Sequence, residues 1–402
     1  MKPKADLSPS TTAIWGAERQ PFWERATQVP VALTVSFQYE TVDELMDVVK
    51  GRKPGHIYGR STNPTVSVAE EKIRLLERGA EACTSFATGM GAISSTLLTL
   101  LRPGDRCVSL ADTYGGTAKL FLEYLPRLDI DCKLCVTSDE EQILAEIQKG
   151  CKVLYLETPT NPTLKIVNIA KLAAAGHAVG ATVVVDNTFA SPINQSPLML
   201  GADLVLHSCT KYLNGHGDCT GGVALGSEDL IRQVYLYREV HGATLDPMSA
   251  YLIIRGLKTL DMRVAKHNAN GMKIAEFLSG QSAVKQVFYP GLSNHDKHQV
   301  AREQMSGFGG MLSFTLKDLE TAKEFCGHLN LAFNAASLGH VETLVSLPMT
   351  SSHVECSEEE RRGLGIDEGL IRYSTGIEDS DDLIADIEQA LYKCGAEAED
   401  HG

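Results

Sequence analysis

A single lysine, Lys211, directly follows a run of apolar residues in the stretch ADLVLHSCTKYLNGHGD, residues 202–218. Burying a lysine is costly unless its ammonium group is paired or used in chemistry. A partly desolvated lysine is a nucleophile that forms a Schiff base with an aldehyde. Ser208 and Thr210 lie beside it at offsets suited to hydrogen-bonding a phosphate. A surface lysine in a turn is the alternative interpretation.

A glycine-containing stretch, ATGMGA at residues 87–92, is expected to open a helix. Gly89 and Gly91 would let backbone N–H groups approach an anion closely at the helix N-terminus. The stretch is not a dinucleotide fingerprint, because Ser94 stands where the third glycine is needed, and it is not a P-loop. Glycines that serve tight packing alone are the alternative.

Asp186 ends another apolar stretch, TVVVD. A buried carboxylate can hold a proton on a heteroaromatic nitrogen and keep that ring cationic, although an aspartate there can also simply cap the next loop. Together with Lys211, Ser208 and Thr210 it would supply the amine, the phosphate ligands and the acid that pyridoxal 5'-phosphate (PLP) requires. The residues therefore favour PLP as the cofactor and predict no metal.

The elements that must position these residues form an alternating pattern. Continuous apolar strands at 105–112, 152–157, 181–190 and 202–211 alternate with helices at 66–79, 89–104, 138–150 and 168–180. Ser138 and Glu141 would form a capping box. This order predicts an α/β fold with a mostly parallel sheet covered on both faces. In such sheets ligands bind beyond the carboxyl ends of the strands, where Glu157, Asp186 and Lys211 would lie.

Three domains are expected. Residues 1–60 read as a loop-like arm, 61–257 as the large α/β domain, and 258–402 as an α+β C-terminal domain. The pattern of alternating strands and helices changes to an α+β pattern after one long helix expected over 253–280. The acidic end, AEAEDHG, is expected to be solvated and disordered.

Charge and composition narrow the class of protein. A formal net charge of −14 argues against a nucleic-acid or anionic-membrane partner. No apolar signal segment opens the chain, and ten scattered cysteines lack the spacing of a secreted scaffold, so a cytoplasmic location is expected. The pair Cys132 and Cys135 lies in a strand-like segment, and plain half-buried thiols are favoured there over a metal or redox role.

Seven ordered motifs resemble the Cys/Met-metabolism family of PLP-dependent enzymes, which includes methionine γ-lyases, cystathionine γ-synthases and O-acetylhomoserine sulfhydrylases. Besides the lysine stretch, which looks like the family's PLP-attachment signature, the motifs are YGRSTNPT, ATGMGA, DTYGGT, ETPTNP, VVVDNTFA, SLGHVETL and IRYSTGIED. The resemblance implies the type I (aspartate aminotransferase-like) PLP transferase fold. It also implies a homo-oligomer, with a dimer as the smallest active unit and a tetramer as the usual family assembly.

The resemblance also assigns roles to residues. Lys211 would bind PLP and shuttle protons, Asp186 would pair with the pyridine nitrogen, and Tyr114 would stack on the ring and act as an acid or base. The remaining implied contacts are Gly89, Met90, Ser208 and Thr210 for the phosphate, Tyr58 and Arg60 for the phosphate in the neighbouring subunit, Asn161 for the ring oxygen, and Arg372 with Ser337 for the substrate carboxylate. Without the resemblance, Arg372 would read as a surface ion pair.

Departures from the family patterns suggest which reaction occurs. Gly116 replaces the cysteine that methionine γ-lyases carry, and Arg238–Glu239 replaces their lysine–aspartate pair. Ala336 replaces the glutamate of cystathionine γ-lyases and γ-synthases. We therefore expect γ-replacement on an O-activated homoserine such as O-acetyl-L-homoserine, by a small sulfur or carbon nucleophile, through a vinylglycine-type intermediate. The alternative is a γ-elimination lyase that gives 2-oxobutyrate and ammonia.

The sequence argues against two other classes of protein. A nicotinamide-dependent oxidoreductase predicts G-x-G-x-x-G after the first strand, and no such motif is present. A catalytically inactive regulatory protein predicts loss of the lysine or its acid partner, and Lys211 and Asp186 are both present.

Overall fold

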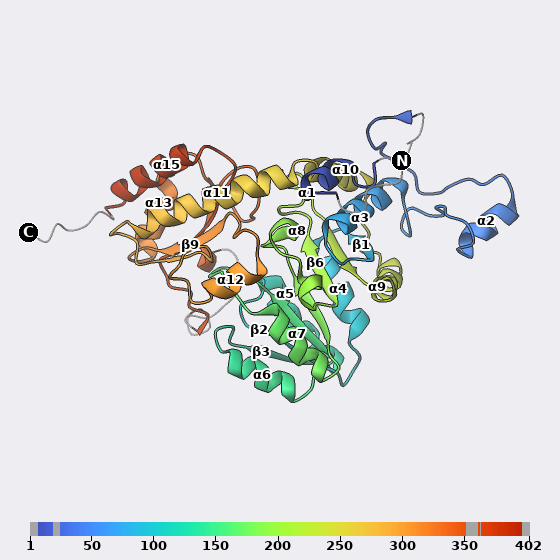
Figure 1. The fold of residues 1–402 in the computed structure, drawn as a ribbon, viewed down its shortest axis with the longest axis horizontal. Coiled ribbons are helices and arrows are strands. Elements are labelled where there is room, and N and C mark those ends of the chain that lie inside the picture. The colour runs from blue at the N-terminus through green and yellow to red at the C-terminus, as the bar shows by residue number, and fades with distance from the viewer. Residues whose placement is uncertain (1–6, 19–24, 351–360, 362, 396–402) are drawn as a thin grey trace, which may run out of the picture. The chain divides into compact units, whose positions relative to one another are not determined.

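The computed structural model describes residues 7–18, 25–350, 361 and 363–395, and Figure 1 traces their fold. The acidic end of the chain, 396–402, lies outside these residues. Two compact units are present: unit 1 comprises 1–99 and 206–260, and unit 2 comprises 100–205 and 261–402. The three-domain division expected from the sequence remains a prediction.

Unit 1 contains a short antiparallel strand pair and its surrounding helices. Ala82 to Phe86 of β1 pair with Gly226 to Gly222 of β7. The elements are α1 (Pro9–Trp15), α2 (Val42–Val49), α3 (Pro64–Leu76), β1 (Ala82–Phe86), α4 (Gly89–Leu100), β7 (Gly222–Gly226), α9 (Glu228–His241) and α10 (Pro247–Leu257). Strand β6 (Leu204–Ser208) crosses the boundary between the two units.

Unit 2 contains four parallel strands and the helices that follow them. Strand β2 pairs with both β3 and β4, and β4 pairs with β5, all in parallel. The elements are β2 (Arg106–Leu110), α5 (Gly115–Lys119), β3 (Asp131–Cys135), α6 (Glu140–Gln148), β4 (Val153–Glu157), α7 (Ile169–Ala178), β5 (Thr182–Asp186) and α8 (Ser191–Asn194), with a π-helical turn at Leu120–Tyr124 and 3₁₀ turns at Pro126–Leu128 and Pro197–Leu200.

The second half of unit 2 is an α+β arrangement. A five-stranded sheet has the order β10-β11-β12-β9-β8 and is mostly antiparallel. Its elements are α11 (Leu260–Ser279), β8 (Gln286–Phe288), α12 (His298–Gln304), β9 (Met311–Thr315), α13 (Leu319–His328), β10 (Phe333–Asn334), β11 (Leu344–Ser346), β12 (Leu370–Ser374) and α15 (Ser380–Lys393), with a 3₁₀ turn at Pro348–Thr350.

Two large apolar clusters stabilise unit 2, beside a small one at Ile166, Ala190, Ala301 and Met305. One joins the four parallel strands to α6 and α7 through fully buried side chains such as Val108, Leu154, Val183 and Leu172. The other joins the antiparallel sheet to α11, α13 and α15. β-Branched side chains favour the pleated, doubly covered strand TVVVD, and this is why Asp186 is delivered at a fixed strand end. The predicted α/β fold with a mostly parallel sheet is confirmed.

Three local predictions were wrong. The expected helix over 253–280 is two helices, because the N–H of Lys258 bonds back to Arg255 and Gly256 in a tightened last turn, and α11 restarts at Leu260. Helix α6 is capped by Asp139 rather than Ser138, since the Asp139 carboxylate accepts from the Gln142 N–H at 2.9 Å.

The third concerns the first 60 residues, which are not all loop. Ser8 caps α1 and Thr41 caps α2 through their side-chain oxygens.

The segment expected to be a strand at Cys132 and Cys135 is β3, and both thiols are free.

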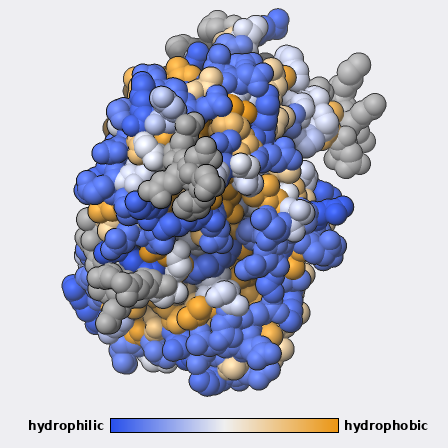
Figure 2. Space-filling view, turned by 90° about the vertical axis from the view of Figure 1, so that its left-hand side faces the viewer, coloured by the Kyte–Doolittle hydropathy of each residue, from blue (hydrophilic) through white to orange (hydrophobic). Residues whose placement is uncertain are grey.

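Hydrophilic residues dominate the face of the molecule in Figure 2, and hydrophobic residues lie there in small groups. In the part of the chain that is described, no helix combines the length and the apolar character needed to cross a bilayer. The same residues hold no group of three or more potential metal ligands.

Candidate active site

The lysine of the opening stretch sits immediately beyond the end of β6 in unit 1. The strand ends at Ser208, and the chain turns so that the Lys211 N–H donates to the Ser208 carbonyl oxygen at 3.2 Å. The Thr210 hydroxyl accepts from the Gly221 N–H at 3.1 Å, which holds this turn against the segment before β7. Lys211 is half-buried. The turn therefore presents an amine and two hydroxyl residues within four positions.

The glycine stretch packs directly against this turn. A Cβ at Gly89 would lie 2.8 Å from the Ser208 Cβ, a distance that real Cβ contacts do not reach. Helix α4 begins at Gly89, so its N-terminus lies beside Ser208. The Thr88 hydroxyl accepts from the Gly91 N–H at 2.9 Å. The sequence left open whether these glycines serve tight packing or an anion-binding helix end. Gly89 is required for tight packing against Ser208, and it also begins a helix whose N-terminal N–H groups could bind an anion.

The segment carrying Tyr58 and Arg60 is held within unit 1 by α9. The Arg60 guanidinium donates to the Glu239 carbonyl oxygen at 3.0 Å, and the Ser61 hydroxyl donates to the Glu239 carboxylate. Arg238 donates to the Ser61 carbonyl at 2.7 Å and to the Ser85 carbonyl at 3.0 Å.

Arg238 is only 3 % exposed, so its guanidinium is used inside unit 1. In the sequence, Arg238 is a departure from the methionine γ-lyase pattern that bears on the choice of reaction. Its contacts show that it positions the Tyr58–Arg60 segment.

Asp186 in unit 2 is surrounded by hydrogen-bond donors. Its Oδ1 accepts from the Thr188 N–H at 3.0 Å and from the Thr188 hydroxyl at 2.6 Å, and its Oδ2 accepts from the Tyr155 hydroxyl at 3.3 Å. Burial raises the pKa of Tyr155 well above its usual range, so this hydroxyl stays a donor. Several donors on a carboxylate favour its ionised form. The carboxylate is thereby fixed in orientation at the end of β5.

Glu157 ends the neighbouring strand and lies directly opposite Asp186 in the β4–β5 register. Burial, followed by the charge of Asp186, raises the pKa of Glu157 well above its usual value. The Glu157 carboxyl oxygen accepts from the Tyr114 N–H at 2.8 Å. This bond holds the first turn of α5, where Tyr114 is the N-cap and its ring is 47 % exposed. Gly116 lies in the same turn.

Arg372 is the third group of unit 2. It lies in β12 and is 6 % exposed, and its hydrogen-bond partners among the described residues are all neutral oxygens. Its Nη1 donates to the Asn161 side-chain oxygen at 3.2 Å, its Nη2 to the Ser337 carbonyl at 3.2 Å, and its Nε to the Ser346 hydroxyl at 3.3 Å.

Burial lowers the pKa of Arg372 to about 10, so the guanidinium is still cationic at neutral pH. A buried cation whose partners are all neutral is suited to a carboxylate ligand. The surface ion pair considered for Arg372 is wrong.

Ser337 is held in an unusual backbone conformation, with a φ of +151°. Its hydroxyl bonds to the His340 Nε2 at 3.0 Å, and its carbonyl faces Arg372. Such a conformation costs about 1–3 kcal/mol and is found where a site needs a particular carbonyl direction. Ala336 immediately precedes it and is exposed.

Several residues of the site were given no role by sequence reasoning. Thr188 orients Asp186, Glu157 holds Tyr114, and Ser346 supports Arg372. Thr188 has a local signal, since a hydroxyl two residues after a strand-end aspartate can bond back to it. Ser346 has none, because it meets Arg372 only through the pairing of β11 with β12.

Each unit thus holds part of the equipment that one cofactor chemistry requires. Unit 1 offers an amine, hydroxyls and a helix N-terminus whose approach to Ser208 leaves no room for a Cβ. Unit 2 offers an oriented carboxylate, an exposed aromatic ring and a buried cation without a carboxylate partner. This set of residues fits PLP, and it defines the class as that of the PLP-dependent enzymes.

Comparison with known proteins agrees. Residues 10–392 match the family described as Cys/Met metabolism PLP-dependent enzyme, and the chain belongs to that family. It is 42 % identical over 369 residues to an L-methionine gamma-lyase of Fusobacterium nucleatum subsp. polymorphum, covering 91 % of this chain and 93 % of the relative. It is 43 % identical over 342 residues to a cystathionine gamma-lyase of Bacillus subtilis (strain 168), covering 85 % and 90 %.

Among solved structures, the fold is similar to cystathionine gamma synthase from Xanthomonas oryzae pv. oryzae in complex with aminoacrylate and cysteine. The TM-score is 0.92 at 36 % identity, covering 98 % of this chain and 100 % of that one. The protein is therefore a PLP-dependent enzyme of Cys/Met metabolism with the type I fold. Its family carries out elimination and replacement reactions.

Proposed function

We propose that this enzyme catalyses γ-replacement on an O-activated homoserine, with O-acetyl-L-homoserine as the leading substrate. A small sulfur or carbon nucleophile adds at Cγ as acetate leaves. The proposal includes a cytoplasmic location. The observation that carries the reaction is that the hydrogen-bond partners of Arg372 among the described residues are neutral oxygens, while Gly116 and Ala336 carry neither a thiol nor a carboxylate.

The roles proposed for the chain's residues follow from their contacts. When bound, PLP supplies the sink for electrons released at the substrate α-carbon. Lys211 would hold the cofactor through its aldehyde group and would move the substrate α-proton. Asp186, oriented by Thr188, holds the proton on the ring nitrogen. Arg372 binds the substrate carboxylate through two N–H groups.

Further residues complete this proposed site. Tyr114 stacks on the ring and acts as an acid or base, with its backbone held by Glu157. Gly89, Met90, Ser208 and Thr210 bind the phosphate, Asn161 contacts the ring oxygen, and Ser337 lies beside the substrate carboxylate.

The absence of polar side chains at two positions supports replacement over the reactions of the named relatives. Methionine γ-lyases use a cysteine where Gly116 stands, and a glutamate that recognises cystathionine is replaced by Ala336. A pocket with less polar substituents and more space accommodates an incoming nucleophile beside the reacting Cγ. The substrate amino acid and this nucleophile are the small-molecule partners that we propose.

Product identification tests the proposal. The holoenzyme is incubated with O-acetyl-L-homoserine alone and together with sulfide, a small thiol or an enolisable ketone, and the amino acids formed are identified by mass spectrometry. We expect a new amino acid and one equivalent of acetate with at least one nucleophile. If every mixture yields only 2-oxobutyrate, ammonia and acetate, replacement is wrong.

A γ-elimination lyase is the second candidate. It is favoured by relatives named L-methionine gamma-lyase and cystathionine gamma-lyase at 42 % and 43 % identity. The same incubation with L-methionine or L-cystathionine distinguishes the two. A lyase releases 2-oxobutyrate from one of these substrates faster than it forms any replacement product from O-acetyl-L-homoserine.

The N-terminal arm supports a homo-oligomer, with a dimer as the minimum and a tetramer as the usual family assembly. Helix α2 buries none of its residues, although three of them are apolar. Val42, Met46 and Val49 are exposed at 76, 39 and 56 %. Their spacing places them on one helix face. Figure 1 shows this helix extending away from α3 and α10 of its own unit. We propose that the face packs on a second copy and brings Tyr58 and Arg60 to the neighbour's phosphate.

Light scattering tests whether the apolar face of α2 contacts a second copy of the chain. We expect the wild-type protein at the mass of a dimer or tetramer, and the double variant Val42→Glu with Met46→Glu at a smaller mass with lower activity, because charges disfavour a buried apolar contact. Lys50→Gln, at the end of the same helix, is the control and should change neither. An unchanged mass for the double variant would show that this face is not an interface.

A further inference from the structure

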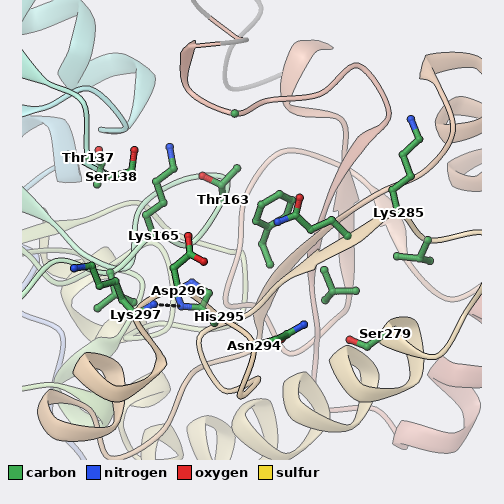
Figure 3. Close-up of a pocket in the computed structure, with 16 residues that line it drawn as sticks. Thr137, Ser138, Thr163, Lys165, Ser279, Lys285, Asn294, His295, Asp296 and Lys297 are labelled. Atoms are coloured by element: carbon green, nitrogen blue, oxygen red, sulfur yellow. Dashed lines mark hydrogen bonds between the residues drawn. The ribbon is translucent and has the colours of Figure 1, made fainter. Parts of the chain in front are cut away.

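A second cavity lies within unit 2 and contains none of the proposed active-site residues. Its volume is about 320 Å³, which is in the range of small-molecule sites. Figure 3 shows the side chains around it. The lining residues are Thr137, Ser138, Thr163, Lys165, Ile166, Ser279, Val284, Lys285, Gln286, Val287, Phe288, Asn294, His295, Asp296, Lys297 and Gly365.

The wall of this cavity carries an excess of positive charge. Three lysines line it against one acid, Asp296, in a chain whose formal net charge is −14. The Lys285 ammonium donates to a backbone carbonyl, that of Lys317, at 2.6 Å. Lys297 lies 3.4 Å from the Glu140 carboxylate, which Lys171 shares. Lys165 and Lys297 are paired with Asp112 and Glu140, which do not line the cavity, so the wall itself holds more basic than acidic side chains. A concave wall of this kind favours anions locally.

Lys165 has a defined orientation in this wall. Its ammonium group donates to the Asp112 carboxylate and to the Leu364 carbonyl, each at 2.8 Å. An ammonium has three N–H donors, so these two bonds leave one for a further acceptor. The side chain is 24 % exposed. Figure 3 places Lys165 on the same side of the cavity as Thr137, Ser138 and Thr163, with Lys285 on the other.

Two hydroxyl groups beside Lys165 lack hydrogen-bond partners within the described residues. They belong to Thr137 and Thr163, which are 4 % and 1 % exposed. Buried polar groups are nearly always hydrogen-bonded, so each exception needs an explanation. Each hydroxyl would donate to an acceptor in the cavity once rotation about χ1 turned it toward that space.

Part of the remaining wall is apolar, beside the polar residues Ser279, Gln286 and Asn294. Ile166, Val284, Val287 and Phe288 line it, and they suit a short hydrocarbon body rather than a bare inorganic ion. We propose that this cavity is a second ligand site, for a small aliphatic carboxylate whose acidic group binds at the Lys165, Thr137 and Thr163 side. Its hydrocarbon part packs on the apolar wall. The site is separate from the substrate site at Arg372.

Calorimetry on the holoenzyme tests this proposal with butyrate as the probe. Butyramide has the same shape without the charge, and inorganic phosphate has charge without the apolar body. We expect butyrate to bind and to bind more tightly than either. Binding of phosphate in preference to butyrate, or equal binding of butyramide, would overturn the proposal, as would no butyrate binding at all.

Variants assign the bound butyrate to the cavity. Lys165→Gln should weaken binding by about tenfold, because it removes the positive charge of a charge-assisted hydrogen bond. Thr163→Val should weaken it by about three- to tenfold, because it removes a hydroxyl donor. Arg372→Lys reports on any butyrate in the substrate site, and Lys323→Gln, on the exposed surface of α13, is the control.

If Lys165→Gln does not fold, Thr163→Val alone shows whether butyrate binds in this cavity. This variant keeps the side-chain shape and removes a hydroxyl that has no partner among the described residues. The cavity is excluded if Arg372→Lys abolishes butyrate binding while Thr163→Val leaves it unchanged.

Discussion

Replacing Lys211 with alanine is expected to lower kcat for O-acetyl-L-homoserine by at least about a thousandfold. The residue is proposed to act as both nucleophile and proton carrier, and a positioned acid–base group alone contributes about 10² to 10⁴ in rate. Steady-state kinetics at saturating PLP measures the change. The absorbance of the purified variant shows whether PLP still binds through the phosphate and ring contacts.

A matched lysine separates chemistry from folding. Lys323 lies on α13 in an exposed ion pair with Glu320, so Lys323→Ala should leave kcat unchanged. Both variants should have the wild-type circular dichroism spectrum. If folded Lys211→Ala turned over at the wild-type rate, the residue could not be the catalytic lysine. A wild-type protein that stays colourless with added PLP would remove the basis of the whole assignment.

Replacing Arg372 is expected to separate activity from stability. Arg372→Lys should lower kcat/KM by about 30- to 1,000-fold, mostly through KM, because lysine cannot form the paired N–H contacts that a guanidinium makes with a carboxylate. Arg372→Leu should lose at least as much activity. Yet its melting temperature should equal or exceed that of the wild-type protein, since a buried cation with only neutral partners is removed.

Two measurements on the same proteins check this expectation: steady-state kinetics with varied O-acetyl-L-homoserine, and thermal unfolding without substrate. Arg302→Lys, at an exposed arginine of α12, serves as the control and should alter neither. A loss of melting temperature in Arg372→Leu would mean that Arg372 stabilises the fold. Unchanged KM in folded Arg372→Lys would mean that it does not bind the substrate carboxylate.

Sequence reasoning located the parts of the site that depend on local order. Strands with continuous β-branched residues end at polar residues, and neighbouring parallel strands end at one edge, so Glu157 and Asp186 were expected together and lie opposite each other. The lysine stretch and the seven ordered motifs were enough to indicate PLP and the family, which the match over residues 10–392 confirms.

The tertiary structure decided what those residues touch. Arg372 meets Asn161 and Ser337, which are 211 and 35 positions away in the chain, and no periodicity in the sequence encodes such contacts. Arg238 was notable in the sequence as a departure from the methionine γ-lyase pattern, and only the fold shows that helix α9 turns its guanidinium toward Ser61 and Ser85. The break between α10 and α11 likewise follows from a tightened last turn inside an otherwise helical pattern.

The sequence by itself therefore determined the cofactor, the family and the strand-end residues, because these depend on residue types at short, regular spacings. Only the tertiary structure decided that Arg372 is a buried cation with neutral partners and that a basic cavity exists around Lys165. Both depend on packing between segments far apart in the chain, where burial and the choice of partner are set by the whole unit rather than by neighbouring residues.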